Sequence, residues 1–145
     1  MKRSKILGLL ALAAMMLMPA TGCNAQTQAQ LPKEAQTIVQ KHFAGKQILL
    51  VKQEMEWVRR HYDVVFSDGT KIEFDSKGQW VEIDCMHTGV PAALVPQPIM
   101  AFVMKTYPDA VVTKIERDRR GYDVDLSNGL DLEFNSKFQL IDVDN

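Results

Sequence analysis

The sequence is poor in cysteine and lacks the common catalytic motifs. Its two cysteines are Cys23 and Cys85. If Cys23 is lipidated or removed by processing, Cys85 is the only remaining thiol and no internal disulfide can form. No Gly-x-Ser-x-Gly, His-Glu-x-x-His or phosphate-loop motif is present. A hydrophobic core must therefore hold the fold, and the motif content indicates neither an enzyme nor a cofactor.

An excess of positive charge is also missing. The formal net charge is −1, and three of the cations, Lys2, Arg3 and Lys5, lie at the extreme N-terminus. Removing these three positive charges from −1 leaves −4. We expect no nucleic-acid partner, because nucleic-acid binding needs a basic patch that a mildly acidic chain is poorly suited to supply.

Only one long apolar run occurs, from Ile6 to Met18, directly after the charged start. The run is too short to span a membrane as a helix, and this arrangement is typical of a secretory signal. A signal peptide is predicted over residues 1–25, with cleavage near residues 22–25. We therefore expect a protein that is periplasmic or lipid-anchored in the bacterial envelope.

The signal has two alternative modes of processing. Ala20-Thr21-Gly22-Cys23 resembles a bacterial lipobox, which would place a lipid on Cys23, although Ala20 replaces the usual leucine-like residue. A simple signal peptidase would instead cut after Ala25. The remaining residues, 26–145, suffice for a single modest domain.

A stretch of sequence occurs twice, at an offset of 60 residues. Tyr62-Asp63-Val64-Val65-Phe66-Ser67-Asp68-Gly69 matches Tyr122-Asp123-Val124-Asp125-Leu126-Ser127-Asn128-Gly129, and Glu73-Phe74-Asp75-Ser76-Lys77 matches Glu133-Phe134-Asn135-Ser136-Lys137. Apolar and polar residues alternate in each copy, as in half-buried strands, and Asp-Gly or Asn-Gly supplies a tight turn. The repeat predicts two similar units, at about residues 30–86 and 90–145.

Each unit is predicted to begin with a helix. The apolar stripes are Leu31, Ala35, Ile38, Val39 and Phe43 in the first unit, and Ile99, Phe102, Val103 and Tyr107 in the second. Two helices cannot cover both faces of eight strands, so both should lie on one face. The predicted fold is α+β, with two tandem helix-plus-four-strand repeats forming one antiparallel sheet.

Alternation assigns many acidic side chains to the uncovered face of this sheet. The predicted binding face consists of Asp63, Glu73, Trp80, Glu82, Asp123, Asp125, Glu133, Leu140 and Asp142. The same pattern adds Lys71, Asp84, Asp131 and Asp144, together with Lys52, Lys114 and Glu116. Such a face would suit a protein or peptide with a basic patch. An ordinary solvated face, charged to prevent aggregation, is the alternative.

Two other groups of residues have side chains that could bind a metal or take part in catalysis. Asp84-Cys85-Met86-His87 holds four potential ligands, but it lacks the second pair that a closed zinc site needs, so no metal is predicted. Paired carboxylates such as Glu73 and Glu133 lie on exposed strands, with no sign of a cleft that would separate their pKa values. Neither cluster predicts catalysis.

The order of several motifs resembles a known family. Leu31-Pro32, Tyr62-Asp63-Val64, Ser67-Asp68-Gly69, Glu73-Phe74-Asp75, Gly78-Gln79-Trp80-Val81-Glu82-Ile83-Asp84-Cys85, Val90-Pro91 and Tyr107-Pro108 are similar to the PepSY-like proteins exported by Bacteroides-type bacteria. The resemblance covers about residues 30–145. It implies one curved sheet, like that of the beta-lactamase-inhibitor protein, and a binding or inhibitory role in the periplasm. No inhibitor contact residue carries over, because no matching inhibitor motif is present.

The sequence thus predicts an exported, non-enzymatic module that binds a protein or peptide. Inhibition of a protease or beta-lactamase is a specific form that only the resemblance implies. The competing prediction is a structural, envelope-associated lipoprotein with no dedicated ligand.

Overall fold

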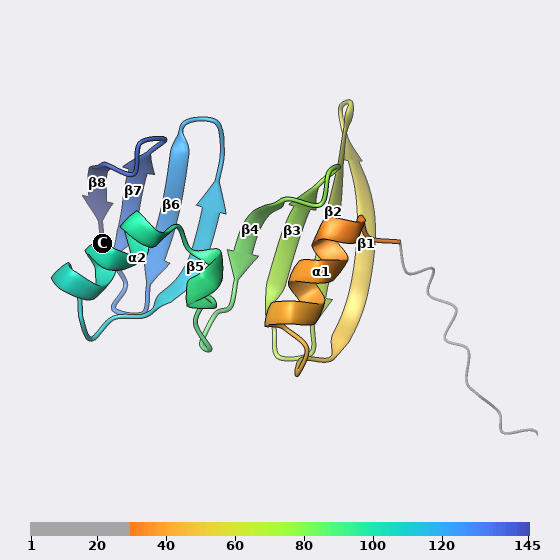
Figure 1. The fold of residues 1–145 in the computed structure, drawn as a ribbon, viewed down its shortest axis with the longest axis horizontal. Coiled ribbons are helices and arrows are strands. Elements are labelled where there is room, and N and C mark those ends of the chain that lie inside the picture. The colour runs from red at the N-terminus through yellow and green to blue at the C-terminus, as the bar shows by residue number, and fades with distance from the viewer. Residues whose placement is uncertain (1–29) are drawn as a thin grey trace, which may run out of the picture.

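The computed structural model describes residues 30–145, which form one open antiparallel sheet of eight strands and two α-helices (Figure 1). The helices are α1 (Lys33–His42) and α2 (Gln97–Thr106), and a short 3-10 helix, η1 (Ala92–Leu94), precedes α2. The strands are β1 (Ile48–Glu56), β2 (Arg59–Phe66), β3 (Lys71–Asp75), β4 (Trp80–Asp84), β5 (Val112–Arg117), β6 (Gly121–Leu126), β7 (Asp131–Asn135) and β8 (Leu140–Asp144). They follow one another in the sheet in chain order, and the predicted α+β class is confirmed.

Both helices lie on the same face of the sheet, with α1 over the first strands and α2 over the last (Figure 1). Ala35 and Val39 of α1 and Ile99 and Val103 of α2 are buried. The buried strand residues are Val64, Phe66, Ile72, Phe74, Ile83, Ile115, Val124, Leu132 and Phe134. The core therefore lies between the helices and one sheet face, and the other face is left uncovered.

Prolines set the points where the helices begin. Pro32 precedes α1 and Pro96 precedes α2, while Pro98 lies in the first turn of α2. The missing N–H of a proline costs little in a first turn, where no backbone acceptor is available inside the helix. Each helix ends with the N–H of the next residue, Phe43 or Tyr107, donating to a carbonyl one turn earlier.

The turns between β2 and β3 and between β6 and β7 are built alike. Gly69 and Gly129 have φ angles of 89° and 87°, which side chains rarely tolerate. The side chains of Asp68 and Asn128 each accept a hydrogen bond from the backbone N–H two residues further on. The Asp-Gly and Asn-Gly turns predicted from the sequence are confirmed.

The hairpin of β1 and β2 is longer than that of β5 and β6. Its strands have 9 and 8 residues, against 6 and 6. Its tip consists of Trp57 and Val58, whose exposed fractions are 98% and 92%.

Trp80 and Leu140 do not lie on the uncovered face, and for these two residues the prediction is wrong. A β-bulge where β4 begins, and another where β8 begins, shift the register by one residue. Trp80 therefore pairs with the buried Phe74, and Leu140 with the buried Phe134. Directly paired residues point to the same face, so both side chains lie on the helix side.

The predicted signal peptide and the lipidation candidate Cys23 fall outside residues 30–145. Within those residues, neither helix has the length and apolar character needed to cross a membrane.

Candidate binding face

The uncovered face of the sheet carries a continuous row of carboxylates that crosses seven strands. From β2 to β8 the carboxylate row consists of Asp63, Glu73, Glu82, Glu116, Asp123, Glu133 and Asp142, each the direct register partner of the next. Lys52 of β1 stands opposite Asp63 and ends the row. Direct partners have Cβ atoms about 5 Å apart, so like charges repel each other there. The row brings together all of the predicted binding-face acids except Asp125.

A second row lies beside the first, two residues along each strand. From β3 to β8 its members are Lys71, Asp84, Lys114, Asp125, Asp131 and Asp144. Cations and acids alternate over the first three of these strands, whereas the last three carry only acids. Negative charge therefore increases across the face toward β8.

Ion pairs with lysine neutralise only part of this face. Lys71 Nζ lies 3.9 Å from Asp63 Oδ2, and Lys114 Nζ lies 3.6 Å from Glu82 Oε2. The ring of His61 contacts Glu73, with Nδ1 3.0 Å from Oε1. Among residues 30–145, no ion pair forms at Glu116, Asp123, Glu133, Asp142, Asp84, Asp125, Asp131 or Asp144. Most of these unneutralised carboxylates belong to β5 through β8.

Burial and neighbouring charges shift the pKa values of several groups on this face. Partial burial, and then the carboxylate of Asp63, raise the pKa of Glu73. Partial burial and the nearby Asp131 likewise raise the pKa of Asp125. Partial burial lowers the pKa of Lys114, but neighbouring carboxylates, chiefly that of Glu82, outweigh this and raise it. A cation bound to the face would relieve part of the repulsion.

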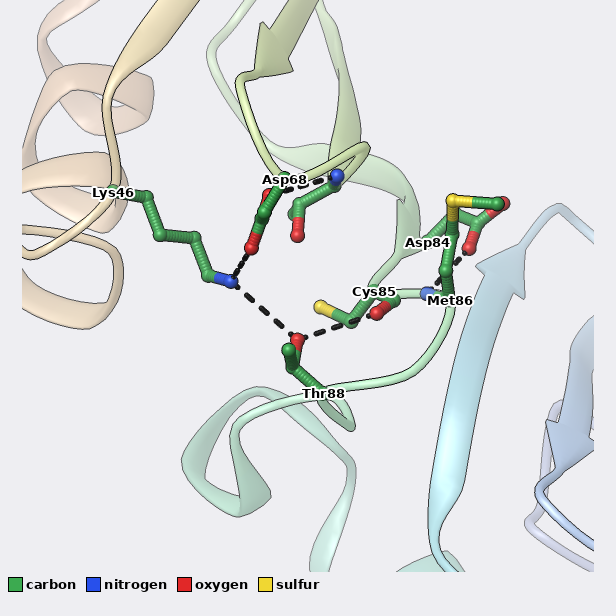
Figure 2. A network of polar contacts seen from close by, with 7 residues as sticks. Lys46, Asp68, Asp84, Cys85, Met86 and Thr88 are labelled. Carbon is green, nitrogen blue, oxygen red and sulfur yellow. Dashed lines mark hydrogen bonds and ion pairs between the residues drawn. The ribbon is translucent and has the colours of Figure 1, made fainter.

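The potential ligand segment Asp84-Cys85-Met86-His87 joins a hydrogen-bond network between three loops, and Figure 2 shows its first three residues there. Lys46, which follows α1, contacts Asp68 of the β2–β3 turn and donates to Thr88 Oγ1 at 3.4 Å. Thr88 Oγ1 donates in turn to the carbonyl of Cys85 at 3.2 Å. Nowhere in the described part of the chain are three His, Cys, Asp or Glu residues grouped so that they could hold a metal ion. The segment thus serves to connect loops.

The linear sequence does not reveal a cationic region at one end of the sheet. Arg59, Arg60, Lys77, Arg117 and Arg119 line one cavity of about 830 Å³ at the strand ends. These residues come from three separate hairpins, so no spacing rule brings them together. The one available signal is that an Arg-Arg pair recurs at residues 59–60 and 119–120.

The fold and the face define a class: an α+β protein with one open sheet, covered by helices on one side and rich in acid on the other. Residues 60–142 match the model of a family described as "Putative beta-lactamase-inhibitor-like, PepSY-like". The chain belongs to this PepSY-like family.

Three solved structures are similar to the chain over most of their length. A "putative periplasmic protein from DUF2874 family" of Bacteroides vulgatus is 46% identical, with a TM-score of 0.79, covering 80% of this chain and 91% of that one. A "putative calcium-regulated periplasmic protein" of Bacteroides thetaiotaomicron is 47% identical, with a TM-score of 0.77 and coverage of 80% and 91%. A second Bacteroides vulgatus protein, of unknown function, is 35% identical, with a TM-score of 0.75 and coverage of 80% and 93%. No curated protein sequence matches the chain.

These relatives confirm the predicted compartment, since all three are described as periplasmic. The protein is a periplasmic member of the PepSY-like family, and neither the family nor these relatives indicate an enzymatic family. The lipid anchor at Cys23 stays a prediction.

Proposed function

We propose that the protein is a non-enzymatic binding module of the periplasm, and that its uncovered sheet face binds a basic segment of a protein or peptide. The observation that carries this proposal is the carboxylate row, in which Glu116, Asp123, Glu133 and Asp142 form no ion pair among residues 30–145. Like charges placed directly opposite destabilise a sheet. Mixing the two signs would keep the face soluble at lower cost, so a row of one sign supports a binding role.

The geometry of the row suggests the size of the ligand. Seven neighbouring strands spaced about 4.8 Å apart make a row of about 29 Å. An extended peptide rises about 3.3 Å per residue, so about nine residues would span it. A basic segment of that length, laid across the strands, would meet the four carboxylates that lack partners.

The direct test uses a fluorescent oligolysine peptide of about ten residues and measures its binding by anisotropy. The variant Glu116→Gln/Asp123→Asn removes two adjacent charges from the carboxylate row. The matched control, Glu34→Gln/Asp109→Asn, removes two exposed carboxylates that lie outside the sheet. We expect the first variant to lose about tenfold in affinity at low salt, since each exposed ion pair is worth up to about 1 kcal/mol and a loss of about 1.4 kcal/mol is tenfold. The control should bind like the parent protein.

Two results would count against the proposal. Equal affinity of the two variants would show that net charge alone, and not the row, attracts the peptide. Failure of any periplasmic protein to bind in a salt-sensitive way would favour the alternative, a structural envelope-associated lipoprotein with no dedicated ligand. Inhibition assays against secreted proteases and beta-lactamases test the narrower role that the family's description suggests.

Calcium belongs in the same titrations as a competitor, because one relative is described as calcium-regulated. A divalent cation would be attracted to the same carboxylates as a basic peptide. If calcium displaces the peptide from the parent protein and raises the parent's melting temperature, but leaves the melting temperature of Glu116→Gln/Asp123→Asn unchanged, the two ligands share the carboxylate row.

We also infer that the chain consists of two tandem copies of one helix-plus-four-strand unit, which share a curved sheet. Supporting this, Tyr62 pairs with Phe74 as Tyr122 pairs with Phe134, and β4 and β8 both begin with a bulge. The 60-residue offset relates each of these pairs.

A further inference from the structure

Two cavities share the residues Arg117 and Tyr122 and together form one groove, which begins on the helix side and ends at the edge of the sheet. The first cavity, of about 540 Å³, is lined mainly by apolar groups, including Trp80, Leu94 and Met100, and it also contains Arg117 and Tyr122. The second cavity, of about 830 Å³, is the cationic region at the strand ends, and Arg117 and Tyr122 line it as well. The groove thus runs from an apolar section, under η1 and the start of α2, to a charged section at the sheet end.

The β-bulge at β4 creates the apolar section. It turns Trp80 toward the helix side, opposite Phe74. The guanidinium carbon of Arg117 lies 4.4 Å from the centre of the Trp80 ring, and Arg117 Nη2 donates to Gln79 Oε1 at 3.5 Å. Stacking on an aromatic face holds a guanidinium in place while leaving its edge free for an anion. Arg117 is therefore fixed at the point where the two sections meet.

The charged section gathers cations from hairpins at one end of the sheet. The hairpin of β1 and β2 supplies Arg59 and Arg60, the β3–β4 turn supplies Lys77, and the hairpin of β5 and β6 supplies Arg119. In Figure 1 these hairpins reach the same edge of the sheet, the upper edge of the view. None of the four takes part in an ion pair within residues 30–145.

The two carboxylates that line the charged section are engaged in their own turns. Asp75 Oδ1 accepts the backbone N–H groups of Lys77 at 2.8 Å and Gln79 at 2.9 Å. Asp118 accepts the backbone N–H groups of Arg120 and Gly121 and pairs with the Arg120 side chain. These hydrogen bonds fix both carboxylates within their turns, so the cations of the groove keep an excess of positive charge in an otherwise acidic protein.

We propose that this groove binds an anionic amphiphile. Its carboxylate or phosphate group would lie against Arg59, Arg60 and Arg117, and its acyl chain or ring would lie along Trp80 and Tyr122. Arginine suits both anions because its planar guanidinium donates two parallel hydrogen bonds. Most small-molecule sites share this design of an apolar cavity with a few placed polar groups. Its apolar section lies on the helix side, away from the carboxylate row, whereas its charged section lies at the sheet end and is also lined by His61, which contacts Glu73 of that row.

The fluorescence of Trp80 can report this binding, because the chain has only two tryptophans. Trp57 lies at the exposed hairpin tip, so Trp57→Phe leaves Trp80 as the single reporter. In this background we expect monomeric dodecyl phosphate to change the Trp80 emission in a saturable way. Dodecyltrimethylammonium, which has the same chain and the opposite charge, should not. Dodecanoate tests whether a carboxylate replaces the phosphate.

Charge variants locate the site. Arg59→Ala/Arg60→Ala should weaken dodecyl phosphate binding by about tenfold or more, because it removes two charged donors. Lys33→Ala/Lys41→Ala removes two exposed cations from α1, outside both cavities, and should bind like the parent. Both double variants change exposed residues, so folding should survive, and circular dichroism checks it.

Several outcomes would overturn the proposal. These are an equal response to the cationic amphiphile, equal weakening by the two double variants, or an unchanged affinity in Arg59→Ala/Arg60→Ala. Binding to phosphatidylglycerol vesicles without binding to the monomeric amphiphile would also overturn it, because the cations would then serve a lipid surface and not the groove.

Discussion

At the scale of single residues, Cys85 shows how burial determines chemistry. The side chain follows β4 and is only 2% exposed. Burial raises the pKa of its thiol to about 11, so the thiolate that reacts with alkylating reagents is scarce at neutral pH. Cys85, the one cysteine within residues 30–145, is thereby protected from mixed disulfides.

We predict that Cys85 resists alkylation by iodoacetamide in the folded protein and reacts readily in urea. Mass spectrometry of the labelled chain, truncated before residue 30 to remove Cys23, measures both rates. Lys46→Met, which removes the contact with Asp68 and the hydrogen bond to Thr88, should loosen these loops and speed the labelling. Rapid labelling of the folded parent would contradict the burial of this thiol.

At the scale of elements, the fold depends on the close approach of strands at one glycine. Gly121 begins β6 and pairs with Asn135 of β7. A Cβ atom placed there would lie 1.8 Å from the carbonyl oxygen of Phe134, which is backbone and cannot rotate away. The pairing of β6 with β7 therefore requires glycine at this position for space.

We predict that Gly121→Ala destabilises the protein by about 3 kcal/mol, at the upper end of the usual cost of overpacking. Gly45→Ala is the matched control, because a Cβ atom at Gly45 meets nothing within 4 Å. Urea unfolding followed by circular dichroism gives both free energies. Equal stability of the two variants would show that β6 and β7 can separate at this point without loss.

At the scale of the whole molecule, the charges are separated between two surfaces. Carboxylates without ion pairs gather on the uncovered sheet face, and cations gather in the groove at the sheet end. The overall charge, which is close to neutral, conceals this separation. Two surfaces of opposite charge therefore coexist on one small sheet.

The pKa shifts of three carboxyl groups lead to a prediction about how stability depends on pH. Partial burial raises the folded pKa values of Glu73 and Asp125 above 4.5 and 3.8, so the folded state binds more protons in that range than the unfolded state. Stability then rises as the pH falls from neutral toward about 4.5. The pKa of Asp68 has the opposite shift, because hydrogen bonds from Lys46 and Thr70 lower it to about 2. The contribution of Asp68 to stability is therefore present above pH 3.8 and is lost as the pH falls toward 2.

Melting temperatures measured at low salt from pH 8 to pH 2 should therefore pass through a maximum in the mildly acidic range. Asp125→Asn removes one of the raised carboxyls and should flatten the rise, whereas Asp109→Asn, an exposed change off the sheet, should not. High salt should weaken only the part of the effect that comes from repulsion by Asp63 and Asp131, because salt screens charges but does not change burial. A melting temperature that increases steadily up to pH 8 would show that the raised pKa values of these carboxyls have no effect on stability.

The sequence by itself determined the α+β class, the strands, the turns and the acid-rich face, because each depends on local alternation or on a residue such as Gly69 that permits a special backbone angle. The register of β4 and β8 was decided only in the tertiary structure, because a bulge adds one residue without altering the alternation that precedes it. Trp80 consequently lies beside Arg117 on the helix side. The cationic groove was likewise decided by tertiary structure, because three hairpins that are distant in the chain meet only when all the strands have paired.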